Sequence, residues 1–218
     1  MSPRLLALDT TSEYGSIALA EGAQLIEEVA LHAPEGFAHI VFDEIQNLLK
    51  RHRLNLRDLD GFASASGPGS FTGVRVGLTA VKGLAEACGR RVVAVSNLEA
   101  LAWFGTRPLR APVLDARRGE IYGAVYDSHL RPVCQEVVVL FNQWITTLPR
   151  GDLEIVTSGF EVPSPGKFPV ALAPRALARA VASIAAARFA LGRANDPAEI
   201  DANYVRRSDA ELLWRGSS

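Results

Sequence analysis

Three apolar runs open the chain and predict an antiparallel meander of strands. Residues 4–8 are almost wholly apolar, and residues 14–20 and 24–31 alternate weakly between apolar and polar positions. A short apolar run that ends in turn residues, or alternation of this kind, is typical of β-strands. Gly22 separates the second run from the third and favours a tight turn there. We therefore expect three neighbouring strands at the beginning of a mixed sheet.

Two segments in the first half predict helices with unusually wide apolar faces. In residues 35–53, apolar side chains recur at helical spacing at Phe37, Ile40, Val41, Ile45, Leu48 and Leu49, and Ala38 and Phe42 widen this stripe. In residues 72–87, the polar side chains occupy one narrow row, formed by Arg75, Thr79, Lys82 and Glu86. An apolar stripe wider than that of an ordinary surface helix indicates burial on two sides.

The rest of the chain alternates predicted strands with predicted helices, which is typical of an α/β protein. The predicted strands are residues 61–66, 91–95, 111–114, 121–126, 133–141 and 154–158, and the predicted helices are residues 97–104 and 176–191. Residues 162–174 predict a loop. Because residues 106–108 resemble a linker, we expect an N-terminal lobe over residues 1–106 and a C-terminal lobe over residues 107–218. Both halves open with a strand, an Asp-containing turn at Asp9 or Asp115, and a second strand.

Composition and charge exclude several classes of protein. The 218 residues are 48% hydrophobic and 22% charged, which is ordinary for a globular protein and unlike a disordered one. A net charge of −1 argues against binding nucleic acid by charge alone. Cys88 and Cys134 cannot form a disulfide framework or a four-cysteine metal site, and they fit a reducing cytoplasm. The sequence shows no signal peptide and no stretch that could span a membrane.

Polar residues after the first strand and a glycine-rich loop are candidates for a nucleotide site. Asp9 would hold a hydrated Mg²⁺, with the hydroxyls of Thr10 and Thr11 near phosphate. Gly67 and Gly69 precede a predicted helix, whose first N–H groups could bind an anion. The glycine spacing is neither that of a P-loop nor that of a dinucleotide fold. The alternatives, which stay open, are an internally hydrogen-bonded turn and a loop that allows close strand–helix packing.

A row of glycines suggests a close contact with another backbone. Gly69, Gly73 and Gly77 recur at intervals of four, although a helical glycine costs about 1 kcal/mol relative to alanine. We therefore predict a partner interface on the two wide-faced helices, formed by Phe37, Ile40, Val41, Ile45, Gly69, Phe71, Gly73, Val74, Gly77, Ala80 and Val81. On this hypothesis, leucine at Gly73 or Gly77 blocks association and leaves the monomer folded. The alternative is packing inside the chain.

Neither the second polar turn nor the four histidines match a known catalytic or metal-binding motif. Residues 115–120 (DARRGE) carry Arg117 and Arg118, whose charge would attract a phosphate but whose side chains block close backbone approach. A surface ion-pair turn is the alternative. The four histidines form neither H-x-x-x-H nor H-E-x-x-H, and no Ser-His-Asp arrangement is identifiable. We expect no catalytic residue, no metal site and no cofactor.

Five segments, in this order, resemble the TsaB (YeaZ) family of the bacterial threonylcarbamoyladenosine system. They are LDTTS (8–12), ASGPGSFTGVRVG (65–77), SNLEAL (96–101), DARRGEIY (115–122) and YVRR (204–207). The second and the fourth are highly specific, whereas residues 140–200 contribute little. The resemblance implies a two-lobed actin-like fold of the sugar kinase and Hsp70 type.

The same resemblance implies a non-catalytic subunit of a tRNA-modifying complex. Its partner would be a TsaD-type transferase that modifies the adenosine beside the anticodon of ANN-reading tRNAs, bound through the two wide-faced helices. A TsaE-type ATPase would join through the complex, tRNA would be contacted indirectly, no membrane would be involved, and the protein alone would form a homodimer.

The sequence supports this non-catalytic hypothesis at two motifs, one of which is the second polar turn, where Arg117 and Arg118 occupy the phosphate position. The transferase pattern H-x-E-G-H corresponds here to residues 97–101, where Asn97 and Leu101 replace the metal ligands. Two alternatives from other classes remain. One is a stand-alone nucleotide-dependent phosphotransferase that uses Asp9, Thr10 and the glycine loop, and the other is a metallopeptidase on the same fold.

Overall fold

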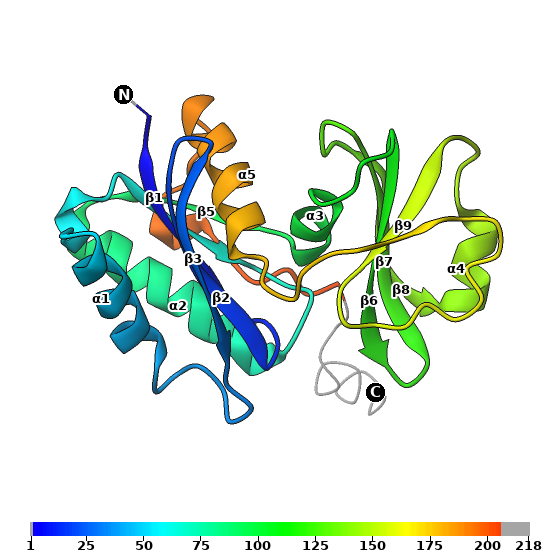
Figure 1. Cartoon of the computed structure of the whole chain (residues 1–218), viewed down its shortest axis with the longest axis horizontal. Helices are drawn as coiled ribbons and strands as arrows, with labels where there is room; N and C mark the ends of the chain where they lie inside the picture. The colour runs from blue at the N-terminus through cyan, green and yellow to red at the C-terminus, as the bar shows by residue number, and fades with distance from the viewer. Residues whose placement is uncertain (1, 206–218) are drawn as a thin grey trace, which may run out of the picture.

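The structure, a computed structural model, describes residues 2–205 and shows two lobes that lie side by side (Figure 1). Each lobe is built on a five-stranded mixed sheet, with the strand orders β3-β2-β1-β4-β5 and β10-β9-β6-β7-β8. The predicted α/β class with two lobes and mixed sheets is therefore confirmed.

The first sheet joins the opening meander to two parallel strands. Its members are β1 (Arg4–Asp9), β2 (Tyr14–Glu21), β3 (Gln24–His32), β4 (Gly61–Ala65) and β5 (Arg91–Val95). The central strand β1 is antiparallel to β2 and parallel to β4. Leu5, Leu6, Ala7 and Leu8 are fully buried. A strand covered on both faces has no position that favours a polar side chain, which explains the unbroken apolar run.

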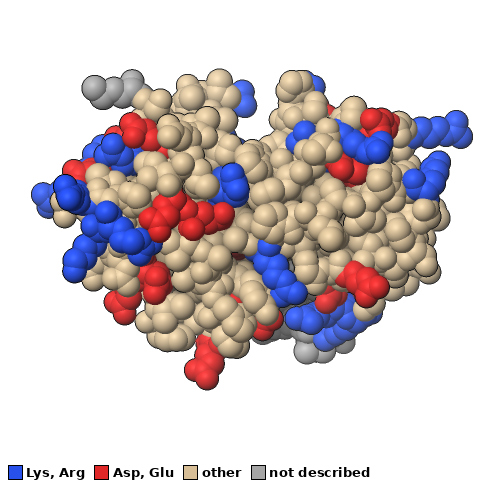
Figure 2. Space-filling view, viewed as in Figure 1, with Lys and Arg blue, Asp and Glu red and all other residues tan. Residues whose placement is uncertain are grey.

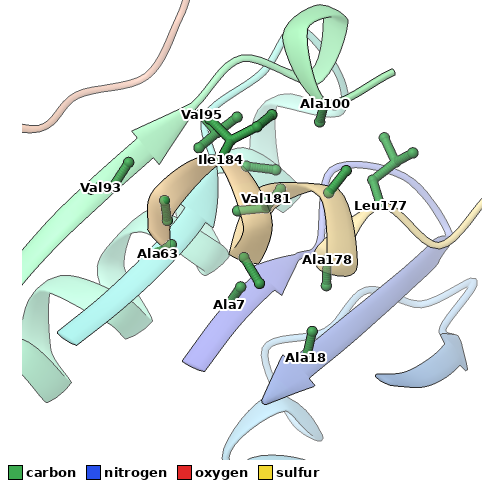
Figure 3. Packing of buried hydrophobic residues seen from close by; sticks show 14 of the residues in the cluster. Ala7, Ala18, Ala63, Val93, Val95, Ala100, Leu177, Ala178, Val181 and Ile184 are labelled. Carbon is green, nitrogen blue, oxygen red and sulfur yellow. The ribbon is translucent and has the colours of Figure 1, made fainter. Parts of the chain in front are cut away.

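Helices cover both faces of this sheet. α1 (Val41–Arg51) and α2 (Phe71–Cys88) lie on one face, and α5 (Ala178–Ala190) lies on the other (Figure 1). Figure 3 shows Ala178 and Val181 of α5 packed over Ala7 and Ala18 of the sheet. Because the facing side chains are small, α5 approaches the sheet closely and is buried along most of its length.

The second lobe repeats the plan of the first. Its strands are β6 (Leu109–Arg117), β7 (Glu120–Asp127), β8 (Pro132–Leu140), β9 (Leu153–Thr157) and β10 (Val170–Leu172). The central strand β6 is antiparallel to β7 and parallel to β9, as β1 is to β2 and β4. Asp9 and Asp115 both lie near the ends of central strands, so the predicted echo between the halves is confirmed. α4 (Phe141–Thr147) packs on the second sheet, and α3 (Asn97–Ala102) lies between the lobes.

Several elements differ from the sequence-based expectation. The first long helix begins at Val41 instead of residue 35, because Gly36 adopts φ +93° in a turn where its N–H donates to the carbonyl of Ala33. α4 begins at the last residue of the expected strand 133–141 and was not predicted, and β10 lies within residues 162–174, which were expected to be a loop. The second sheet begins shortly after the expected boundary at residue 106. However, α5 returns to the first sheet, so residues 107–218 are not confined to the second lobe.

The glycine row of α2 faces the interior of the chain, and this corrects its interpretation as room for a partner. A Cβ atom at Gly73 would lie 2.1 Å from the carbonyl oxygen of Thr10, and one at Gly77 would lie 2.6 Å from Thr10 Oγ1. The Thr10 hydroxyl also donates to the carbonyl of Gly73 at 2.7 Å. Leucine at either glycine would therefore disrupt the monomer itself. Gly83 is different, because it is exposed and no atom lies within 4 Å of its Cβ position.

These environments predict opposite effects for two alanine substitutions in one helix. Gly73→Ala should lower the free energy of unfolding by about 2 kcal/mol or more, because the added methyl group meets rigid backbone. Gly83→Ala should raise it by up to about 1 kcal/mol, because alanine favours the helix and meets nothing. Urea unfolding of both variants measures the two changes. Equal effects would contradict the assignment of the Gly73 contact.

Candidate functional site

A cleft between the lobes collects most of the predicted nucleotide-site residues. It has a volume of about 670 Å³ and is lined by the end of β1, the loop before α2, Asn97 and the turn between β6 and β7. Asp9, Thr11 and Gly69 line it, whereas Thr10 and Gly67 do not. The structure therefore brings the predicted residues together around one cavity.

Several polar groups of this cleft form hydrogen bonds with one another and with the neighbouring backbone. Asp9 Oδ1 accepts hydrogen bonds from the backbone N–H and the hydroxyl of Thr11, at 3.0 and 2.6 Å. The amide of Asn97 donates to Thr11 Oγ1 at 2.6 Å, and its carbonyl accepts from the N–H of Gly67 at 2.9 Å. Burial raises the pKa of Asp9, and the hydrogen bonds from Thr11 and Asn97 oppose that shift. The first motif is thus an internally hydrogen-bonded turn.

The glycine loop is packed tightly against the same turn. A Cβ atom at Gly69 would lie 2.6 Å from the carbonyl oxygen of Thr11, and the Ser70 N–H donates to that oxygen at 2.7 Å. The Ser70 hydroxyl caps α2 by accepting the N–H of Gly73 at 3.3 Å. Two of the donors that an anion would need are therefore occupied. The geometry favours close strand–helix packing, the alternative that the sequence left open.

The second turn is a strained hairpin held by an ion pair. Arg117, Arg118 and Gly119 all have positive φ, at +65°, +57° and +78°. The Arg117 N–H donates to Asp115 Oδ1 at 2.8 Å, and its guanidinium lies 3.6 Å from Asp115 Oδ2. The Arg117 side chain is 87% exposed. The turn is therefore the ion-paired surface turn that the sequence analysis kept as an alternative.

The segment that corresponds to the transferase metal motif serves a packing role. Leu101 is fully buried, and Asn97 belongs to the cleft network. Arg188 Nη2 donates to both carboxylate oxygens of Glu99, at 2.7 and 2.6 Å, although burial raises the pKa of that carboxyl. Within residues 2–205, no three His, Cys, Asp or Glu side chains are grouped as a metal site requires. No helix in that range is long and apolar enough to cross a membrane.

The predicted partner interface divides between the core and the surface. Phe37, Val41, Ile45, Val74, Gly77, Ala80 and Val81 are buried inside the first lobe, Ile40 and Gly73 are half-buried, and Gly69 and Phe71 are exposed. Most side chains of the wide apolar stripes are thus buried where the two helices pack on the sheet. Most of these side chains therefore leave little surface for a partner, although Ile45 also lines the groove beside α1, and the interface stays a prediction.

A different set of residues forms the accessible face of these helices. A groove of about 920 Å³ lies between α1, the short helix η1 (Leu56–Asp58) and α2, and Phe42, Leu54, Leu56 and Leu84 contribute its apolar lining. Phe42 is 55% exposed, although it is large and apolar. The sequence placed Phe42 on the stripe but did not distinguish it from the buried members. Helical spacing alone does not show which edge of a wide stripe the sheet leaves uncovered.

A cluster at the start of α2 was missed by the sequence analysis. Tyr204 stacks on Phe71 with 5.7 Å between ring centroids, and the Arg75 guanidinium lies 3.8 Å from the centre of the Phe71 ring. Arg75 Nε also donates to the Tyr204 hydroxyl at 3.1 Å. The YVRR motif includes Tyr204 but did not indicate that Tyr204 contacts Phe71 and Arg75. Arg206 and Arg207 of the motif lie outside the described residues.

The duplicated strand order and the cleft between two lobes define a protein of the actin-like class. Acidic and basic side chains are interspersed over the face in Figure 2, with no broad area of a single charge. This distribution agrees with the net charge of −1.

Comparison with known proteins identifies the family. The family model of TsaD, tRNA N6-adenosine threonylcarbamoyltransferase, matches residues 32–200. The TsaB protein of Bacillus subtilis is 32% identical over 162 residues, covering 72% of this chain and 71% of its own length. Escherichia coli TsaB is 36% identical over 164 residues, covering 66% and 70%. YeaZ from Pseudomonas aeruginosa superposes with a TM-score of 0.81 at 29% identity, covering 94% of this chain and all of its own. The chain belongs to the TsaB (YeaZ) family, which confirms the resemblance and the actin-like fold that it implied.

The raised pKa of Asp9 predicts a pH-dependent gain in stability for Asp9→Asn. A carboxyl whose pKa is higher in the folded state than in the unfolded state loses folding free energy as pH rises through that window. Asparagine removes this penalty and still accepts both hydrogen bonds from Thr11. The melting temperature should therefore rise at pH 7, and the gain should shrink below about pH 4. Asp43→Asn, an exposed change on α1, serves as the control. A lower melting temperature at pH 7 would reveal a stabilising charge at Asp9.

Proposed function

We propose that the protein is the non-catalytic subunit that binds and activates a TsaD-type transferase for threonylcarbamoylation of the anticodon-adjacent adenosine in ANN-reading tRNAs. The proposal places it in the cytoplasm, with a TsaE-type ATPase joining through the complex and tRNA contacted indirectly. In the absence of the transferase, the chain would form a homodimer through the face of α1 and α2 that would otherwise bind the transferase. The observation that carries the proposal is the cleft whose Asp9, Thr11 and Asn97 groups bond to one another.

That network accounts for the loss of catalysis in an actin-like fold. A nucleotide site needs free hydroxyls, free backbone N–H groups and a carboxylate that is open to a hydrated cation. Here the Thr10 and Thr11 hydroxyls are committed to Gly73 and Asp9, and burial raises the pKa of Asp9. The cleft therefore supports a structural role, and no specific observation favours the phosphotransferase or peptidase alternatives.

The face of α1 and α2 supports association with a homologous subunit. The transferase family model matches residues 32–200, which include both helices. Homologous subunits can therefore bring equivalent helices together about a pseudo-two-fold axis. Phe42 provides exposed apolar area, and the uncovered Gly83 lets a second helix approach α2 closely. Both positions are exposed in the monomer and therefore accessible to a partner.

Reconstitution tests the function directly. A TsaD-type transferase, a TsaE-type ATPase, threonylcarbamoyl-AMP and tRNA are combined with and without this protein. Transfer to tRNA should require the protein, which alone should transfer nothing. Equal activity without it would refute the proposal.

A charge on the exposed helical face should weaken the complex and leave the fold intact. Phe42→Asp should weaken binding to the transferase at least about tenfold, or ~1.4 kcal/mol, because a carboxylate must be desolvated in the interface. Calorimetric titration measures the affinity. Leu172→Asp is the matched control, since Leu172 is 81% exposed on β10 of the other lobe. Similar losses in both variants would place the interface elsewhere.

A further inference from the structure

The last described residues lie against the loop before α2 and its first turn, and Asn203 makes the hydrogen bonds that link them to both lobes. The Asn203 N–H donates to the carbonyl of Ser66 at 2.7 Å. Its side-chain amide donates to Glu136 Oε2 at 2.6 Å and lies 3.5 Å from the carbonyl of Gly67. Asn203 therefore connects the loop before α2, in the first lobe, to β8 in the second lobe. Tyr204, the next residue, lies on Phe71 at the first turn of α2.

Glu136 is the common acceptor of this region. Besides Asn203, its carboxylate accepts hydrogen bonds from the Tyr126 hydroxyl at 2.8 Å and from the Ser96 hydroxyl. The donors come from β7, from the link between β5 and α3, and from the C-terminal segment. Burial and the neighbouring Glu136 carboxylate raise the pKa of Tyr126, so its hydroxyl stays protonated and keeps donating. Hydrogen bonds to a charged acceptor are stronger than neutral ones.

The cluster that this arrangement places on α2 has the chemistry of a protein-binding contact. Phe71 and Tyr204 are 48% and 46% exposed, although both are large aromatic residues. Tyrosine and arginine are enriched among the residues that dominate binding energy. The rings stack on each other, and Arg75 lies over Phe71, so these stacking contacts are already made within the chain. This arrangement favours a protein partner over stacked bases of RNA.

We propose that Glu136 is a positioning residue, which holds Asn203 and thereby fixes Tyr204 on Phe71. Tyr204 then adds to the transferase-binding face that α1 and α2 form. The proposal rests on the proposed function for the identity of the partner, a TsaD-type subunit. It adds that the second lobe influences binding through Glu136, which positions the C-terminal segment on α2. Glu136 bonds to Asn203, Tyr204 is the next residue in the chain, and Tyr204 contacts Phe71 and Arg75.

The positioning step can be tested in the isolated protein. In Glu136→Gln, the acceptor of the Asn203 amide loses its charge, and an amide nitrogen can face the Asn203 side chain. Hydrogen exchange at the backbone N–H of Asn203 should accelerate by about tenfold or more. Glu154→Gln is the matched control, because Glu154 is a buried carboxylate of the same lobe that accepts the Arg107 N–H at 2.6 Å. Unchanged exchange in Glu136→Gln, or equal acceleration in the control, would overturn the proposal.

Binding to the transferase tests the second step. Tyr204→Ala should weaken affinity about tenfold, and Glu136→Gln should weaken it by a smaller factor. The double variant should bind no more weakly than Tyr204→Ala, because both changes act on one contact. Glu154→Gln should bind like the unmodified protein. Additive losses, unchanged affinity in Tyr204→Ala, or a loss confined to tRNA affinity would overturn the proposal.

A swapped pair separates positioning from general stability. Asn203→Asp alone places two carboxylates together and should weaken transferase binding through repulsion. When Asn203→Asp is combined with Glu136→Gln, the carboxylate and the amide have exchanged places and can bond again, so affinity should recover. Failure of the swap to restore affinity would contradict the Glu136–Asn203 link. If the unmodified protein does not bind the transferase, the proposed function fails, whereas the exchange experiment still decides the positioning step.

Discussion

The arrangement of the first lobe depends on the direct contact between α2 and the turn that follows β1. Thr10 bonds to the backbone of Gly73, and the positions of Gly73 and Gly77 have no room for a Cβ atom. Such an approach is possible only for glycine, and it places the helix start directly beside the Thr10–Thr11 turn. The orientation of α2, the shape of the cleft and the face left to solvent all follow from this contact.

The same contact explains why the cleft resembles a nucleotide site without offering one. With α2 drawn onto the turn, Thr11 and the glycine loop are close enough to satisfy each other's polar groups. Asn97, from the link between the lobes, completes the network from the opposite side. The hydrogen bonds of this network join the turn after β1, the loop before α2 and the start of α3. Groups that serve a substrate in an enzyme serve packing here.

The second lobe repeats the first and is connected to it at more than one place. α5 leaves the second half of the chain and covers the first sheet, where its alanines pack over β1 and β2. Glu99 pairs with Arg188 of that helix, and Glu136 receives donors from both lobes. These buried or half-buried polar links resist a change in the angle between the lobes.

The sequence by itself determined most strands and helices and the repeated plan of the lobes, though not α4 or β10, because apolar periodicity and turn residues act over a few neighbouring positions. The specific GPGSFTGVRVG and DARRGEIY segments also identified the family. Only the tertiary structure decided which apolar residues are covered, since Val41 and Phe42 are neighbours on one stripe but only Val41 meets the sheet. It also decided the partners of Asn97 and Asn203, which lie 86 and 67 positions from Thr11 and Glu136. Contacts between residues so far apart in the sequence form only when the chain folds, so the local pattern of apolar and polar residues does not predict them.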